Sequence, residues 1–263
     1  MIVGVTAWRG HGATTVATLL AAAESIRGLR PWLIEADPAG GILAARLELD
    51  SRPATGPGGS ASAGLEHVAF PEARHAITLF ERFSDAAAEW SGVRVVTAPG
   101  DPFRAWACHL PRIPWAPLLR DLDGPVVVDL GRARGGAPNA ALLAQLDVLL
   151  VVTSADLAAV VSTIEWSDSR GRVSPADAGL ALDVTRVVVV DSPDTRLKTT
   201  HTDAESELGE RFAAWLPWAP SAVDLVERGA GFADRRLRRQ PLISAVESLA
   251  DRIDQWAGGE AAA

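Results

Sequence analysis

The chain has 263 residues, of which 48% are hydrophobic, and a formal net charge of −8. This length suits one large α/β domain or two small ones with a full hydrophobic core, and the apolar share argues against global disorder. The negative charge argues against a general nucleic-acid binder. The single cysteine, Cys108, excludes an internal disulfide and a cysteine-rich metal site.

No apolar run reaches the roughly 20 residues that a membrane-spanning helix needs. No basic stretch precedes the apolar N-terminal segment, and no cleavage signature follows it, so secretion is disfavoured. We therefore expect a cytoplasmic protein that does not insert directly into a membrane.

The first elements alternate between strand and helix. Residues 1–7, "MIVGVTA", predict a buried parallel strand, and residues 14–28 predict a helix of small residues. A second strand is expected at Pro31–Asp37, with a helix opening after it. The segment Ser51–Gly64 is rich in glycine, proline and serine, which predicts a flexible surface loop.

The rest of the chain continues this alternation. Residues 65–90 have a helical period interrupted by Pro71, and a helical region is expected to close the chain near Trp256. Apolar strands are expected within 93–100, 125–131, 146–156, 184–194 and 211–220. We therefore predict one α/β domain over residues 1–257, with a mainly parallel sheet of about seven strands and helices on both faces. Residues 258–263 are expected to be a disordered tail.

The stretch "WRGHGATT" lies between the first strand and the first helix, where a phosphate-binding loop of the pattern G-x-x-x-x-G-K-[ST] would lie. Gly10 and Gly12 would let backbone amides approach a phosphate, and Thr14 offers a hydroxyl for Mg²⁺. The lysine position holds Ala13, which removes a contact worth on the order of 1.5–3 kcal/mol. The alternative, that the glycines serve only a tight turn, stays open. The candidate nucleotide-binding residues are Arg9, Gly10, His11, Gly12, Ala13, Thr14 and Thr15.

Two aspartates follow apolar strands and are candidates for the magnesium shell. Asp129 in "VVVDLG" has the place of the strand-end aspartate of P-loop proteins, although it could also cap a turn. Asp37 in "EADPAGG" could orient a water molecule or contact magnesium. The candidate magnesium ligands are thus Thr14, Asp37 and Asp129.

These three segments resemble, in order and context, the P-loop, switch I and switch II of the MinD/ParA-type deviant Walker ATPases. Residues 146–164 resemble that family's fifth strand and the helix after it, and "LPWAP" resembles its strand–proline turn near the base. The resemblance spans nearly the whole chain and is strongest to lysine-poor MinD-like proteins of actinobacteria and to the TadZ/CpaE branch linked to Tad-type pili. It implies a P-loop NTPase fold, ATP and Mg²⁺ as ligands, and dimerisation.

The chain departs from that family at its charged positions. The signature lysine aligns with Trp8, beside Arg9, and Lys198 is the only lysine in the chain. Arg9 could pair with phosphate in part, or could be a solvated surface residue. The family's base-contacting asparagine aligns with Asp191. We therefore do not expect a competent ATPase.

Trp8 has two interpretations. It either folds back onto the sheet edge or forms, with Arg9, an aromatic anchor at a subunit interface. The second interpretation predicts a homodimer, or a heterodimer with a related ATPase. A protein partner from a membrane-associated assembly is a further candidate.

Two features near the C-terminus matter for partners. Four arginines, Arg235, Arg236, Arg238 and Arg239, form either a solvated face or a contact for DNA or an acidic partner. The last helix has an apolar face and an acidic polar side, so we expect it to pack on the core rather than on anionic lipid. The five histidines show no metal-ligand spacing.

The leading prediction is a degenerate MinD/ParA-like protein that acts as a non-hydrolysing scaffold or positioning factor for a Tad-like pilus or secretion system. One alternative is a slow ATPase that cycles between monomer and dimer. The other is a DNA-binding partition protein that uses the four arginines.

Overall fold

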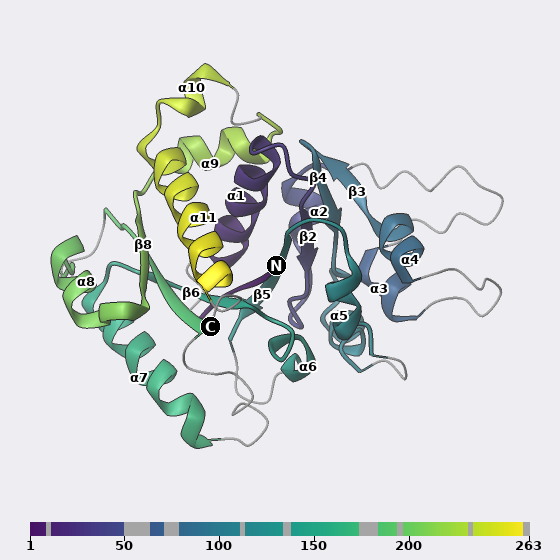
Figure 1. Ribbon diagram of the computed structural model, residues 1–263, viewed down its shortest axis with the longest axis horizontal. Helices are drawn as coiled ribbons and strands as arrows, with labels where there is room; N and C mark the ends of the chain where they lie inside the picture. Colours follow the sequence, from purple (N-terminus) through teal and green to yellow (C-terminus); the bar gives the residue numbers. More distant parts are fainter. Residues whose placement is uncertain are drawn as a thin grey trace.

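An eight-stranded sheet forms the centre of the molecule in the computed structural model, with helices on both faces (Figure 1). The structure describes residues 1–8, 12–49, 64–70, 79–110, 114–133, 138–173, 184–193, 197–230 and 234–259. The strand order is β3-β4-β2-β5-β1-β6-β7-β8, and every pair is parallel except β3 with β4. The predicted α/β architecture with a mainly parallel sheet is confirmed.

The strands are β1 Ile2–Ala7, β2 Trp32–Glu35, β3 Ala88–Trp90, β4 Val93–Val96, β5 Val126–Arg132, β6 Val148–Ser154, β7 Thr185–Val190 and β8 Phe212–Leu216. The α-helices are α1 Ala13–Ile26, α2 Leu43–Arg46, α3 Gly64–Ala69, α4 Leu79–Ala86, α5 Pro102–Ala107, α6 Ala140–Leu143, α7 Leu157–Val173, α8 His201–Leu208, α9 Pro220–Glu227, α10 Arg235–Arg238 and α11 Pro241–Gly259. Two 3₁₀ helices, η1 Ala116–Asp121 and η3 Gly209–Arg211, complete the described elements.

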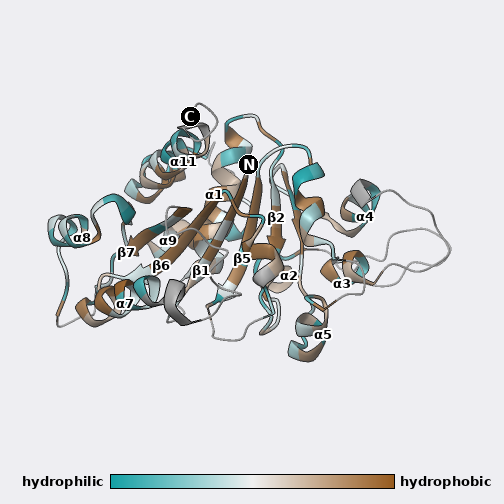
Figure 2. Ribbon diagram, turned by 60° about the horizontal axis from the view of Figure 1, so that its bottom comes forward, coloured by the Kyte–Doolittle hydropathy of each residue, from teal (hydrophilic) through white to brown (hydrophobic). Residues whose placement is uncertain are grey.

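The central strands are apolar on both faces because both faces are covered. Successive side chains of a strand point to opposite sides of the sheet. In β1, Val3 and Val5 join the core cluster that includes α1 and α11, whereas Ile2 joins the cluster on the other face. Figure 2 shows β1, β5 and β6 as continuous hydrophobic strands between the helices. This burial explains why the sequence has apolar runs there rather than alternation.

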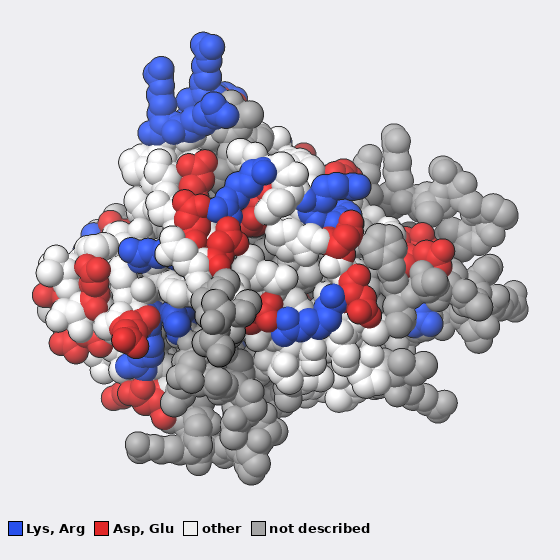
Figure 3. All heavy atoms as spheres, in the orientation of Figure 1, with Lys and Arg blue, Asp and Glu red and all other residues white. Residues whose placement is uncertain are grey.

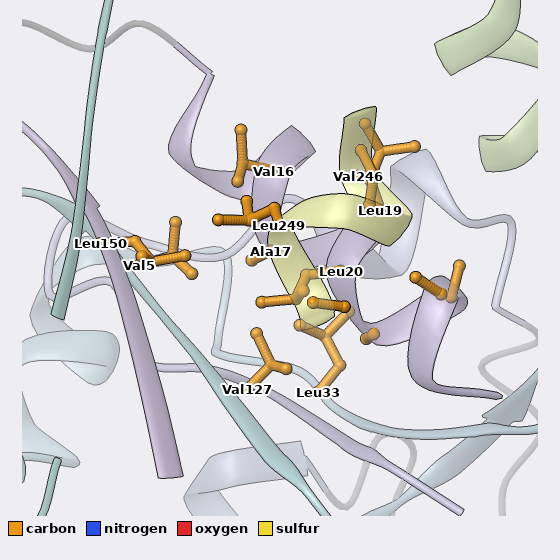
Figure 4. Packing of buried hydrophobic residues seen from close by; sticks show 14 of the residues in the cluster. Val5, Val16, Ala17, Leu19, Leu20, Leu33, Val127, Leu150, Val246 and Leu249 are labelled. Atoms are coloured by element: carbon orange, nitrogen blue, oxygen red, sulfur yellow. The ribbon is translucent and has the colours of Figure 1, made fainter. Parts of the chain in front are cut away.

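Helix α1 is nearly all buried and is itself covered by α11 (Figure 1). In Figure 4, Leu249 of α11 lies beside Ala17 of α1, and Val246 lies beside Leu19. On the polar side, Arg27 at the end of α1 pairs with Asp251 and Asp254 of α11. The expectation that the last helix packs on the core is confirmed.

The predicted helix over residues 65–90 is wrong at its end. Helix α4 stops at Ala86, and β3 pairs antiparallel with β4. The two strands are joined by Ser91 and Gly92, with φ of 48° and 81°. Two consecutive positive φ values are the signature of a two-residue hairpin turn whose twist matches that of the strands. Serine is not a usual residue for the first position, so the turn was hidden in the sequence.

Two other expectations concern the margins of the domain. Residues 51–63 of the expected surface loop lie outside the described residues, and Gly64 already belongs to α3. Helix α11 continues to Gly259, so the first two residues of the expected tail are helical, while 260–263 lie outside the described residues. In the described ranges, no helix has the length and apolarity needed to cross a bilayer.

We expect Leu249→Ala to lower the free energy of unfolding by about 2–5 kcal/mol, because the leucine is fully buried between α11 and α1. Urea denaturation measures this loss. The exposed neighbour Glu247 provides the control, and Glu247→Ala should change stability by no more than about 0.5 kcal/mol. Equal effects of the two substitutions would contradict the packing of α11 on α1.

Candidate nucleotide-binding site

The candidate site lies where the parallel strands β1, β2 and β5 end and α1 begins. Ligands of open α/β sheets bind at this carboxyl edge. The ends of β1 and β5 are tied together, because the Thr6 hydroxyl donates to the Gly131 carbonyl oxygen over 3.0 Å. The edge is therefore a fixed platform for the side chains that follow the strands.

Gly12 joins the loop to α1 in a left-handed conformation, with φ 81° and ψ 24°. Among the described residues no atom would touch a Cβ at this position, so the backbone angle rather than lack of space calls for glycine. Gly12 is the N-cap residue and has no side chain to cap the amides of the first turn of α1. Free amides at a helix N-terminus attract anions. The other loop candidates, Arg9, Gly10 and His11, lie outside the described residues.

The position of the lost lysine is part of the core. Ala13 is 6% exposed and packs in the cluster around α1. The only lysine of the chain, Lys198, forms an ion pair with Asp191 after β7. Lys198 therefore does not take the place of the missing loop lysine.

Asp129 is the most unusual group at this edge. It is 1% exposed, its Oδ1 accepts a hydrogen bond from the Gly131 amide over 3.0 Å, and the hydroxyl of Thr14 lies beside the carboxyl group. Its Oδ2 is buried and has no hydrogen-bond partner among the described residues. Buried polar atoms normally have partners, so this oxygen is suited to an additional ligand. A carboxylate oxygen next to a threonine hydroxyl fits Mg²⁺, which keeps several of its own waters.

Asp37 lies at the same edge as Asp129. Its Oδ1 accepts a hydrogen bond from the Ala39 amide over 2.8 Å. A Cβ on Gly131 would overlap the Asp37 carboxyl group, so this glycine lets Asp37 lie across the end of β5. The structure thus brings together Thr14, Asp37 and Asp129, the three magnesium candidates. Within the described ranges no group of three or more acidic, histidine or cysteine side chains could hold a metal alone, so nucleotide oxygens and water would have to complete the shell.

Glu35 is a buried carboxyl group that the sequence analysis missed. It accepts hydrogen bonds from the amides of Ile42, Leu43 and Ala98, over 2.6, 3.0 and 3.0 Å. These bonds fix the segment that follows Asp37, which gives Glu35 a positioning role. Its burial raises its pKa, and the three amides counteract this rise. A glutamate within the apolar run "PWLIEAD" was the signal that could have revealed it.

A cavity of about 520 Å³ opens between α1, the ends of β6, β7 and β8, and α9. Gly12, Thr15 and Arg46 lie at its phosphate-loop end, and Asp191 and Trp218 belong to the segments after β7 and β8. This volume is within the usual range for small-molecule sites. The cavity therefore extends from the loop to the strand ends beyond it, as a nucleotide site requires.

Arg46 supplies a positive charge that the sequence analysis also missed. Its Nη2 donates to the Thr15 hydroxyl oxygen over 2.9 Å and pairs with Glu227 of α9. A guanidinium beside the second loop threonine can approach a phosphate oxygen, although its pairing with Glu227 reduces its net charge. The signal was only its place in α2, after the segment that contains Asp37.

Trp8 packs against its own chain. Its ring stacks on Trp166 of α7 at a centroid distance of 5.3 Å, and its Nε1 donates to the Ser162 hydroxyl over 3.0 Å. The ring is half-buried. The first interpretation predicted that Trp8 folds back onto the sheet edge. Trp8 does fold back onto its own chain, but these contacts place it against α7.

Asp129 should give the chain a distinctive pH dependence. Burial raises its pKa from 3.8 to about 7, so between these values the folded chain keeps a proton that the unfolded chain has lost. The free energy of unfolding therefore falls as pH rises through this window. Asp129→Asn cannot ionise and should gain about 2–3 kcal/mol relative to the unmodified chain between pH 5 and pH 8. Urea denaturation without Mg²⁺ measures the difference, and a gap that does not change with pH would contradict this account.

Comparison with solved structures identifies the fold. No protein-family model and no curated protein sequence matches the chain. The cell division ATPase MinD of Pyrococcus furiosus has a TM-score of 0.70 and 20% identity, over 97% of this chain and 98% of that one. MinD of Pyrococcus horikoshii, in complex with Mg-ADP, has a TM-score of 0.70 and 17% identity over 98% and 97%. A ParA family ATPase of Chlorobium tepidum has a TM-score of 0.67 and 14% identity over 95% and 96%. This chain has the fold of the MinD and ParA ATPases.

Proposed function

We propose that this chain is a degenerate MinD/ParA-type protein that binds a nucleotide with Mg²⁺ and does not hydrolyse it. The observation that carries the proposal is the Oδ2 of buried Asp129, which has no hydrogen-bond partner among the described residues and lies near Thr14 at the start of α1. A helix start alone serves many turns. A buried carboxylate oxygen without a partner has no use in a simple turn and costs stability.

Different described residues would bind the phosphates and the Mg²⁺ ion. The amides at the start of α1 would hold phosphate oxygens, and Arg46 would add charge near Thr15. Thr14 and Asp129 would hold Mg²⁺, which when bound neutralises phosphate charge. Ala13 offers no charge to the terminal phosphate, and phosphoryl transfer depends on such electrostatic stabilisation. The geometry thus favours binding over turnover.

The cellular role follows from this chemistry as part of the same proposal. A protein that holds nucleotide without turnover acts as a scaffold or positioning factor, here for a Tad-like pilus or secretion system. The resemblance of the chain to lysine-poor MinD-like proteins and to the TadZ/CpaE branch supports this role. Partners would then be proteins of a membrane-associated assembly.

Two alternative functions make different requirements of the chain. A slow ATPase would need Arg9 or a group from a second subunit in place of the lysine. A DNA-bound partition protein would use the arginines of α10, whose basic side chains project from one end of the molecule (Figure 3). Arg236 is paired with Asp234, which reduces the charge of that cluster. Steeply salt-dependent DNA binding would favour the partition protein, since phosphate contacts release counterions.

Restoring the lysine tests the phosphate site. Ala13→Lys should tighten binding of the Mg²⁺ complexes of both ATP and GTP by about tenfold or more, because a charge-assisted contact is worth roughly 1.5–3 kcal/mol. Isothermal titration measures each affinity. Ala13→Met is the control, since its side chain is similarly long and uncharged and tests only the tight packing around residue 13.

The methionine variant should show no gain. Circular dichroism establishes that both variants fold. A folded lysine variant with no detectable affinity for either nucleotide would show that residues 8–15 form only a turn, and the nucleotide site would be rejected.

We also propose that the chain dimerises through the face that carries Trp8 and Arg9. Trp8 is only half-buried by its contacts with α7, and two other side chains of the same helix, Leu157 and Val161, are 47% and 45% exposed. A partner subunit would cover this apolar surface. A related ATPase with intact lysines could take the place of the second copy.

Trp8→Ala should weaken the dimer, because full burial of a large apolar side chain is worth roughly 1.5–3 kcal/mol. Analytical ultracentrifugation measures the dissociation constant with and without nucleotide. Leu29→Ala is the control, since Leu29 is an exposed apolar residue beyond the other end of α1. A monomer at high micromolar concentration would reject the homodimer, and an unchanged dimer in the Trp8 variant would place the interface elsewhere.

A further inference from the structure

The cavity has two chemically different ends. Its loop end meets the start of α1, where phosphates bind in P-loop folds. A nucleotide bound there must direct its base along the cavity, toward the residues that follow β7 and β8. Those residues are Asp191, Ser192, Leu216, Pro217, Trp218 and Ala219. The side chains of this group therefore decide which base fits.

Trp218 and the neighbouring apolar residues offer the base a surface but little selectivity. Trp218 is 55% exposed although it lines the cavity, so its ring is accessible to a ligand. Stacking on an aromatic ring is available to every base, because every base has a π-face. Selection between bases must come from the polar groups.

Asp191 is the charged residue that lines the cavity at the end of β7. Its Oδ1 accepts hydrogen bonds from the Ser192 amide, over 2.7 Å, and from Lys198. Both of these contacts are made by Oδ1, and neither involves Oδ2. The side chain is 28% exposed, and Lys198 beside it is 41% exposed. A carboxylate and an ammonium group thus lie side by side at the end of β7, and the carboxylate lines the cavity.

The two purines differ at the edge that such a pair would meet. Guanine presents two donors, N1–H and the 2-amino group, followed by the acceptor O6. Adenine presents a donor, the 6-amino group, and the acceptor N1. An ionised aspartate only accepts hydrogen bonds, and a lysine only donates them. Asp191 can therefore accept from both guanine donors while Lys198 donates to O6, which gives three hydrogen bonds. Adenine can make only two with the same pair, from its 6-amino group to Asp191 and from Lys198 to N1.

We propose that the cavity selects guanine nucleotides, with Asp191 accepting from N1–H and the 2-amino group and Lys198 donating to O6. The inference rests on the proposed nucleotide site and adds the base that it takes. It gives the only lysine of the chain a binding role away from the phosphate loop.

Titration of the unmodified chain with nucleoside diphosphates and Mg²⁺ tests this selection without any turnover. GDP should bind at least about tenfold more tightly than ADP, a difference of roughly 1.4 kcal/mol. IDP keeps N1–H and O6 but lacks the 2-amino group, so it should bind more weakly than GDP. Equal or tighter binding of ADP would overturn the selection and leave the nucleotide site intact. No binding of any nucleotide would overturn both.

Asp191→Asn should create a new binding preference, which a misfolded variant would not show. The amide of asparagine accepts through its oxygen and donates through its nitrogen, which matches the N1–H and C2 carbonyl of xanthine. The variant should therefore lose the preference for GDP over ADP and bind XDP more tightly than the unmodified chain does. Asp254→Asn is the matched control, because Asp254 is also paired with a basic side chain but lies on α11, about 18 Å along the helix from Leu242 at the cavity.

The control should keep the preference for GDP. If the Asp191→Asn variant folds and its affinities for GDP and ADP keep the same ratio as in the unmodified chain, Asp191 serves only to hold Lys198, and the proposal is wrong.

Discussion

The burial of one carboxyl group, that of Asp129, is the constraint on which the site depends. The parallel sheet brings the ends of β2 and β5 together, so Glu35, Asp37 and Asp129 share one edge. Burial is the main reason that the pKa of Asp129 rises, and the two neighbouring carboxyl groups add to it. These neighbouring carboxyl groups destabilise the fold when no cation is bound. A cation bound at this edge of the sheet would remove that cost, because it compensates the charge that burial makes costly.

If the cavity binds a nucleotide as proposed, its two ends would contribute to the binding energy differently from those of an intact P-loop site. Without a loop lysine, the phosphates are left with the amides of α1 and with Arg46, whose charge is shared with Glu227. The base end has a charged pair of its own, Asp191 and Lys198. In the proposed complex, recognition would therefore move toward the base, and stabilisation of a leaving phosphate would be weak. Both changes would favour a protein that retains its nucleotide.

The sequence predicted the architecture well because the strands are buried on both faces and stand out as apolar runs. It also predicted the place of Asp129 and Asp37, because both follow such runs directly. The β3–β4 hairpin was missed because its turn uses Ser91, which does not signal a positive φ. Glu35, Arg46 and the pairing of Lys198 with Asp191 were missed because their partners are distant in sequence or on other elements. Only the folded sheet edge brings these groups together.

The most direct test of the central claim follows nucleotide binding and phosphate release in one sample of the unmodified chain. The chain is mixed with ATP or GTP and Mg²⁺, separated from free nucleotide, and the bound nucleotide is identified by chromatography. The account predicts that the bound nucleotide is recovered as intact triphosphate and that phosphate release stays at background. Steady phosphate release that Asp129→Ala abolishes, or recovery of no nucleotide at all, would contradict it.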